Sequence, residues 1–140
     1  MDTNGNTKEL LIKDLSSRLP YEVIVDYSYN SYDLHKGNYV KHAKHGSKCI
    51  LTCSLLDVFI SPRENEAGEY IKPYLFPLSS MTEEQKVIYG DLCYSIIQSL
   101  AKNMQSELNE LINWLNKNHF DYGGLIPMNL AIDATGLNIY

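Results

Sequence analysis

The stretch that decides the fold runs from Glu22 to Tyr29 and reads Glu-Val-Ile-Val-Asp-Tyr-Ser-Tyr. Apart from Ile24, apolar or aromatic residues alternate with polar ones, as in a strand with one buried face. β-branched and aromatic residues also favour a pleated sheet. The stretch therefore predicts a half-buried strand, and its inner face would carry Val23, Val25, Tyr27 and Tyr29.

A short amphipathic helix is expected before this strand. Leucines recur there at four-residue spacing among charged side chains, at Leu11, Leu15 and Leu19. That spacing keeps them on one face of a helix. Asn6 or Thr7 can cap its beginning, and Pro20 ends it because the residue before a proline avoids the helical region. We expect residues 1–6 to be loose.

After this strand, segments typical of turns alternate with segments typical of strands. Asn30–Gly37 is turn-like, Asn38–His42 predicts a weakly apolar strand, and His45–Ser47 predicts another turn. Cys49–Ile60 is apolar on both of its alternating faces, which is typical of a strand covered on both sides. We therefore place Cys49–Ile60 in the middle of the sheet.

Two prolines shape the segment that follows a charged loop. Pro73 and Pro77 exclude a helix and predict an extended path over the surface for Tyr70–Leu78. A second pattern begins directly after it. The Ser80 hydroxyl and the Glu83 carboxylate have the spacing of a capping box, so a helix should follow from about Met81.

This helix cannot continue unbroken to Asn118. A row of apolar residues advances in steps of four, and each step drifts by about 40° around a helix of 3.6 residues per turn. The row comprises Ile88, Leu92, Ile96, Leu100, Met104 and Leu108. We predict a break near Lys102–Ser106 and a second helix that ends near Asn118. A turn at Asp121–Gly124 and a short edge strand around Met128–Asp133 complete the chain, with Thr135–Tyr140 loose.

Together these elements predict an α+β fold: an N-terminal helix, a small mostly antiparallel sheet, two C-terminal helices and a short closing strand. The 140 residues, 44% hydrophobic and 21% charged, suit a single globular domain spanning residues 1–140. The composition excludes collagen-like, disulfide-scaffold and disordered classes. No apolar run approaches the ~20 residues of a membrane span, so we expect no membrane partner.

Charge is unevenly distributed along the chain. The net charge is −5, yet no acidic residue lies between Asp33 and Asp57, where four lysines give a local charge of +4. Five of the eleven tyrosines fall between Tyr21 and Tyr39. Lysines can attract an acidic partner, while tyrosines favour protein interfaces or stack nucleic-acid bases. The candidate binding residues are Tyr32, Lys36, Tyr39, Lys41, Lys44 and Lys48.

Two other interpretations of this segment stay open. In the first, the lysines belong to a solvated hairpin whose charge keeps a sheet edge from aggregating. In the second, the tyrosines of the preceding strand are core residues whose hydroxyl groups reach water.

The sequence contains no set of catalytic or metal-binding residues whose spacing would bring them together in one site. The candidate metal ligands are His35, His42, His45, Cys49 and Cys53, and His42 with His45 also has the spacing for a weakly bound metal at a turn. On a strand, the Cα atoms of Cys49 and Cys53 would lie about 13 Å apart, too far to share one zinc ion. We therefore predict no catalytic residue, no metal and no cofactor.

The cysteines and His119 remain to be interpreted. Three cysteines cannot all pair, which suggests reduced, buried thiols and a cytoplasmic protein; Cys93 should pack in the core. His119 can pair with Asp121 or simply complement the dipole at a helix end, and the sequence leaves this open.

Three blocks resemble a group of small proteins of gut Bacteroides-type bacteria, their prophages and other mobile elements. They are Leu10–Tyr21, Ile71–Glu84 and Trp114–Ala131, the last containing Asn118-His119-Phe120-Asp121 and Gly124-Leu125-Ile126-Pro127. The group often has Gly where Asn129 stands here. It has no assigned activity, so the resemblance implies a setting and not a mechanism.

Three function hypotheses follow, of which a small enzyme or metal protein ranks last. The first is a non-enzymatic interaction protein of a phage or mobile element, which binds an unknown protein partner through the segment between Glu22 and Tyr70. The alternative is a nucleic-acid-binding accessory protein that uses the lysines and tyrosines of residues 32–48. The sequence does not determine the oligomeric state.

Overall fold

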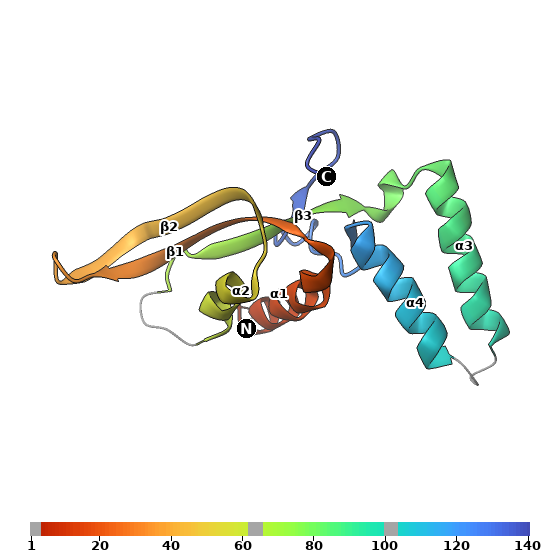
Figure 1. Cartoon of the computed structure of the whole chain (residues 1–140), viewed down its shortest axis with the longest axis horizontal. Helices are drawn as coiled ribbons and strands as arrows, with labels where there is room; N and C mark the ends of the chain where they lie inside the picture. Colours follow the sequence, from red (N-terminus) through yellow and green to blue (C-terminus); the bar gives the residue numbers. More distant parts are fainter. Residues whose placement is uncertain (1–3, 62–65, 100–103) are drawn as a thin grey trace.

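The computed structural model describes residues 4–61, 66–99 and 104–140 of the chain, without the side chains of residues 4–6. The fold is α+β, as predicted (Figure 1). Its helices and strands follow in the order α1 (Asn4–Arg18), β1 (Ile24–Asp33), β2 (Asn38–Ile50), α2 (Cys53–Ile60), β3 (Tyr70–Pro77), α3 (Glu83–Gln98), α4 (Met104–Lys117), β4 (Phe120–Asp121) and β5 (Ile132–Asp133). Short 3₁₀ turns, Leu19–Tyr21 and Leu78–Ser80, follow α1 and β3.

A five-stranded mixed sheet has the order β2-β1-β3-β4, with β5 also pairing with β3. β1 is antiparallel to both β2 and β3, whereas β4 and β5 run parallel to β3. β3 is extended, as its prolines predict, but it is a central strand and not a surface path. Ile71 and Leu75 are buried. The ladder between β1 and β3 ends at Pro73, which has no N–H to donate, and the pairing with β5 begins at Tyr74.

The main core lies between this sheet and the helices α1 and α2. It contains Leu11 and Leu15 of α1, Val25 of β1 and Leu56 and Phe59 of α2. A second, smaller core joins α4 to β4, and its buried members are Met81, Leu115 and Phe120. The inner faces predicted for the first helix and the first strand are therefore confirmed. α1 already begins at Asn4, earlier than predicted, and ends at Arg18, before Pro20.

The prediction of a central strand at Cys49–Ile60 is wrong. β2 ends at Ile50, and α2 begins after Thr52, whose side chain accepts a hydrogen bond from the Leu55 N–H. Leu56 and Phe59 then face the core. An apolar run of this length is compatible with a strand as well as with a helix. The Thr52 cap and the packing of this segment against α1 favour the helix.

The turn predicted at His45–Ser47 is also wrong, because these residues lie within β2. Gly46 lies opposite Tyr27, and a Cβ atom added to it would be 2.5 Å from the Tyr27 ring. The glycine therefore serves close packing inside a strand. The turn predicted over Asn30–Gly37 is shorter than expected, since β1 continues to Asp33.

The C-terminal helices are two, as predicted, and α3 ends at Gln98 while α4 begins at Met104. The predicted break at Lys102–Ser106 lies partly outside the described residues. The capping box is shifted by two positions from Ser80 and Glu83: Thr82 caps the helix and Gln85 completes the box. Ser80 instead donates a hydrogen bond to the carbonyl of Pro77.

The last segment differs from its prediction in two ways. The closing strand covers only Ile132–Asp133, while residues 125–129 form turns. The tail is anchored: Tyr140 Oη accepts from the Ile24 N–H and donates to the Tyr74 carbonyl. Among the described residues, no helix is long and apolar enough to cross a membrane.

Candidate functional site

The most prominent feature of the molecule is a two-stranded projection at one end (Figure 1). β3 pairs with β1 only from Val25 to Ser28, so β1 and β2 continue beyond the body as a ribbon. We call residues 31–44 the arm. Its turn spans residues 34–37 and is closed by a hydrogen bond from the Gly37 N–H to the Asp33 carbonyl. The Asp33 carboxylate accepts the N–H groups of His35 and Lys36.

Near the tip, the structure brings together two of the predicted binding residues. Tyr32 and Tyr39 are cross-strand partners, and their rings meet edge to face with centroids 5.4 Å apart. Their exposed fractions are 49% and 37%, and Leu34 in the turn is 86% exposed. The tip therefore presents a small aromatic and apolar surface to solvent.

The predicted lysines are all exposed but do not form one patch. Lys44 lies opposite Tyr29, on the face of the ribbon that α1 and α2 cover farther along. Tyr32 is three residues beyond Tyr29, so alternation along β1 places the Tyr32–Tyr39 pair on the other face. Lys36 lies in the turn. The positive charge therefore surrounds the arm instead of marking one side.

Two irregularities interrupt β2 along the arm and at its base. Three residues, 41–43, lie opposite Asn30, and His42 adopts a positive φ of 54°. The Asn30 side chain accepts the His42 N–H and donates to the Ala67 carbonyl. The Ser28 hydroxyl and the His42 ring are also hydrogen-bonded. These contacts attach the base of the arm to the segment that precedes β3.

The second irregularity lies beside Asp26. Its carboxylate accepts hydrogen bonds from the Ser47 hydroxyl, the Lys48 N–H and the Tyr74 hydroxyl. Burial, followed by the bond to Asp26, raises the pKa of Tyr74. Lys48 has a φ of 55°. Bulges of this kind twist an edge strand and keep it from pairing with another chain. The ribbon thus offers its faces and tip, and not a regular edge, to a partner.

No metal centre is assembled from the histidines and cysteines of this segment. In the part of the chain that the structure describes, no group of three or more His, Cys, Asp or Glu residues could hold a metal ion. The prediction of buried thiols is wrong for Cys53, which is exposed, while Cys49 and Cys93 are half-buried. Cys53 lies in the first turn of α2 because this segment is helical.

A second candidate, which the sequence did not reveal, is a hollow of about 480 Å³ where α4 ends. His119 and Tyr140 line it together with Ser80, Thr82 and Lys117. The His119 ring stacks on that of Tyr140, and its backbone has a φ of 61°. Burial, and secondarily the positive charge of Arg18, lowers the pKa of His119 to about 4. The imidazole is therefore neutral at physiological pH.

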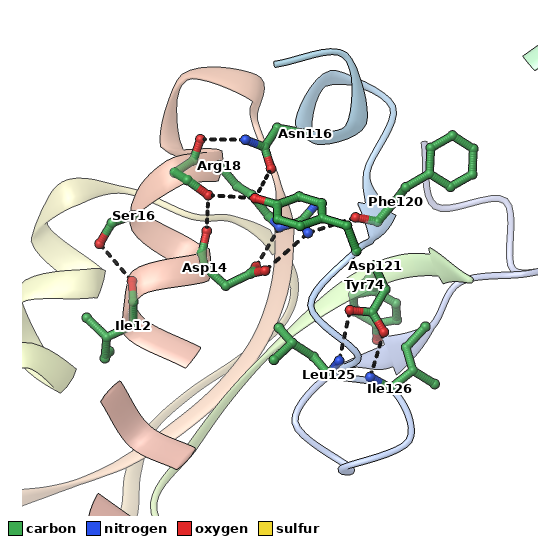
Figure 2. A network of polar contacts seen from close by, with 12 residues as sticks. Ile12, Asp14, Ser16, Arg18, Tyr74, Asn116, Phe120, Asp121, Leu125 and Ile126 are labelled. Carbon is green, nitrogen blue, oxygen red and sulfur yellow. Dashed lines mark hydrogen bonds and ion pairs between the residues drawn. The ribbon is translucent and has the colours of Figure 1, made fainter. Parts of the chain in front are cut away.

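His119 does not pair with Asp121, so one of the two roles that the sequence left open is excluded. Asp121 instead accepts the N–H groups of Leu125 and Ile126, as Figure 2 shows. Its carboxylate organises the turn between β4 and β5. Burial raises the pKa of the Tyr140 hydroxyl to about 12, so the tyrosine stays protonated. A pKa of about 4 for the imidazole and of about 12 for the phenol both lie far from neutral pH, where general acid–base catalysis works best with a pKa close to the ambient pH.

A buried polar network lies between α1 and α4 (Figure 2). Arg18 is fully buried, and its guanidinium binds the Asp14 carboxylate and the Phe120 carbonyl. The Tyr122 ring lies 4.9 Å from the guanidinium carbon, and its hydroxyl donates to Asn116. The guanidinium joins a carboxylate of α1 to a carbonyl of β4, and the Asn116 side chain of α4 donates to the Ser17 carbonyl of α1. We infer that this network has a structural role, since its contacts hold α1 against α4 and β4.

A hollow of about 500 Å³ also opens between α1 and the start of β3. Its walls include Leu11 and Phe59 from the main core, with Lys8, Glu66 and Lys72 at the polar side. Lys8 and Glu66 form an ion pair there, 3.6 Å apart.

Comparison with known proteins found no protein-family model, no curated protein and no solved structure that matches the chain.

Proposed function

We propose that this protein is a non-enzymatic binding protein of the cytoplasm, and that its arm holds a protein partner with an acidic surface. In the setting that the sequence resemblance suggests, this is an interaction module of a phage or mobile element. The observation that carries the proposal is the arm itself, a basic ribbon with an exposed tyrosine pair that projects from an acidic body.

The charge distribution supports an acidic partner. The arm carries Lys36, Lys41 and Lys44 and one carboxylate, Asp33, so its net charge is +2, and the rest of the chain has a net charge of −7 when this +2 is subtracted from the total of −5. An acidic body repels acidic surfaces, while the arm attracts them. This difference would orient an approaching partner toward the arm.

The composition of the tip supports a protein partner. Tyr32, Leu34 and Tyr39 are large side chains that solvent reaches. Tyrosine is enriched where proteins meet because its ring buries a large area at low cost in conformational entropy. The lysines around the tip would form the polar rim of such an interface.

The experiment is site-specific photocrosslinking in host cells, followed by reconstitution with the purified partner. A photoreactive residue at position 39 should capture one defined protein, whereas the same residue at Tyr70, in the body, should not. The double variant Tyr32→Ser/Tyr39→Ser should weaken binding of that purified protein by about 30-fold or more. Equal capture from both positions, or unchanged affinity of the double variant, would contradict the proposal.

Nucleic acid is the second candidate, favoured by the distribution of lysines around both faces and the turn of the ribbon. A two-stranded β-ribbon fits the major groove of DNA, and exposed tyrosines can stack unpaired bases. In an anisotropy titration with duplex and single-stranded oligonucleotides, binding would have to weaken steeply with salt. Each of Lys36→Gln, Lys41→Gln and Lys44→Gln should then lower the salt slope by about 1, while Lys13→Gln on α1 leaves it unchanged. Absence of binding at low salt would exclude this candidate.

A further inference from the structure

Helix α3 forms the end of the molecule opposite the arm (Figure 1). It packs on α4, where the Tyr89 and Trp114 rings lie 6.5 Å apart, and α4 separates it from the rest of the chain. All of α3 lies within the described residues, and none of its side chains is buried. Such a helix covers its neighbour with one face and leaves the other to solvent.

The outer face of α3 carries a row of exposed apolar residues, which the exposed Glu83 precedes by one turn. Val87, Tyr94 and Ile97 are 64%, 62% and 68% exposed, and Gly90 lies between them with open space where a Cβ atom would be. The four positions follow one another at intervals of three, four and three residues. That is the spacing of the seam positions in a two-stranded coiled coil. We call these four residues the outer stripe.

We propose that the outer stripe is the contact through which two copies of this chain pair, helix against helix. The inference is independent of what the arm binds. The pairing would join two α3–α4 hairpins into a bundle of four helices, an arrangement in which such hairpins commonly bury their apolar faces.

The stripe supplies the apolar centre of a possible helix-pair interface. Val87, Tyr94 and Ile97 are each about two-thirds exposed, so together they leave a mostly apolar patch on the order of a few hundred Å² in contact with water. Monomers rarely expose more than a few hundred Å² in one patch. A stable interface takes ~800 Å² from each partner, so the polar residues that flank the stripe would have to supply the rest of the buried area.

The stripe is complementary to itself. Each copy supplies a large ring, Tyr94, and one turn away a gap at Gly90 into which the ring of the other copy fits. By the helical angle, Asp91 and Lys86 lie on opposite flanks of the stripe; Lys86 Nζ also pairs with Glu83 of its own helix at 3.0 Å, so in a dimer it would be shared between Glu83 and Asp91 of the other copy. A two-fold interface brings the same patch of both subunits together. A patch that carries both a ring, Tyr94, and the space for a ring, at Gly90, can therefore bind a second copy of itself.

Pairing through α3 would place the two arms at the far ends of the dimer, because the arm and α3 lie at opposite ends of the molecule (Figure 1). A dimer of this kind would present two binding elements at once. Two linked elements bind a repeated or extended target more tightly than one.

Sedimentation equilibrium over a range of concentrations tests the pairing. The natural sequence should show a reversible monomer–dimer equilibrium. Val87→Gln/Ile97→Gln should weaken it by about 30-fold or more. Ile88→Gln is the matched control, because Ile88 is 44% exposed on the same helix but lies well off the stripe; it should leave the equilibrium nearly unchanged.

Gly90→Gln separates pairing from folding. Glutamine is a better helix former than glycine, and nothing in the single chain lies within 4 Å of a Cβ atom at position 90. The variant should unfold at the same or a higher temperature and yet lose the dimer. A natural sequence that stays monomeric throughout, or a dimer that survives Val87→Gln/Ile97→Gln and Gly90→Gln, would overturn the proposal.

Discussion

The imidazole ring of His119 lies flat against the phenol ring of Tyr140, with centroids 3.6 Å apart and planes inclined by 9°. His119 follows α4, and Tyr140 belongs to the segment after β5, so the stack joins two parts of the chain that no strand pairing connects. Tyr140 also bonds the backbone of β1 at Ile24 and of β3 at Tyr74. One side chain therefore fastens the last segment across the sheet.

The first prediction concerns this fastening. Tyr140→Phe should lower the free energy of unfolding by about 1–2 kcal/mol, because it removes both hydrogen bonds and keeps the stack. Tyr140→Ala should cost about 2–4 kcal/mol, since the ring contacts are lost as well. Urea unfolding gives both values. If Tyr140→Ala cost no more than a few tenths of a kcal/mol, the anchoring role would be wrong.

The second prediction is a pH dependence that originates at His119. The folded-state pKa of about 4 lies below the ordinary value of 6.5, so the unfolded chain binds the proton more tightly. Stability is therefore full above pH 6.5 and is lost as the pH falls toward 4. Because the ring is partly exposed, solvent screening limits the loss to roughly 1–2 kcal/mol.

His119→Asn is the matched variant for this test, since asparagine tolerates the positive φ of position 119. Other titrating groups are common to both proteins and cancel in the comparison. The unfolding free energy of the natural protein minus that of His119→Asn should fall by roughly 1–2 kcal/mol as the pH falls from 6.5 to 4. A difference that stays constant with pH would exclude His119 as the source.

The third prediction concerns the buried ion pair. Asp14→Ala should destabilise the protein by about 3–5 kcal/mol, because it leaves the fully buried Arg18 guanidinium without its counter-charge. Asp14→Leu/Arg18→Met should cost less than Asp14→Ala alone, since no unpaired charge remains. Glu9→Ala, at an exposed carboxylate of the same helix α1, serves as the control and should stay within about 0.5 kcal/mol of the natural protein. Equal effects of Asp14→Ala and Glu9→Ala would show that the pair is unimportant.

The fourth prediction distinguishes the two residues that can cap α3. Thr82→Ala should lower the unfolding free energy by about 1 kcal/mol, because the Thr82 side chain accepts the Gln85 N–H. Ser80→Ala leaves that cap in place and should cost less. The comparison by thermal unfolding would contradict the structure if Ser80→Ala were the more damaging change.

Elements with a clear single period were predictable from the sequence. The leucines of α1 and the alternation of β1 each fit only one kind of structure, and Leu15 and Val25 are buried as expected. The phase of the apolar row between Ile88 and Leu108 also required two helices, because a straight helix rotates its face away from the core. In these cases local periodicity and burial agree.

Elements that fit two structures, or that depend on distant contacts, were not predictable. Cys49–Ile60 is apolar in any conformation, and its division into the end of β2 and helix α2 rests on the Thr52 cap and on packing against α1. Gly46 indicated a turn by composition, but it serves the close approach of Tyr27. β3 lies at the centre of the sheet because β1 and β5 pair with successive halves of it.

The sequence by itself determined the fold class, the helix and strand that open the chain, and the basic, tyrosine-rich character of residues 32–48, because these are properties of neighbouring residues. Only the tertiary structure decided that the lysines surround a projecting arm instead of forming one patch, that His119 stacks on Tyr140, and that α3 keeps an apolar stripe facing solvent. Those outcomes depend on which distant segments meet, and meeting is governed by packing and register across the whole chain, which no local pattern encodes.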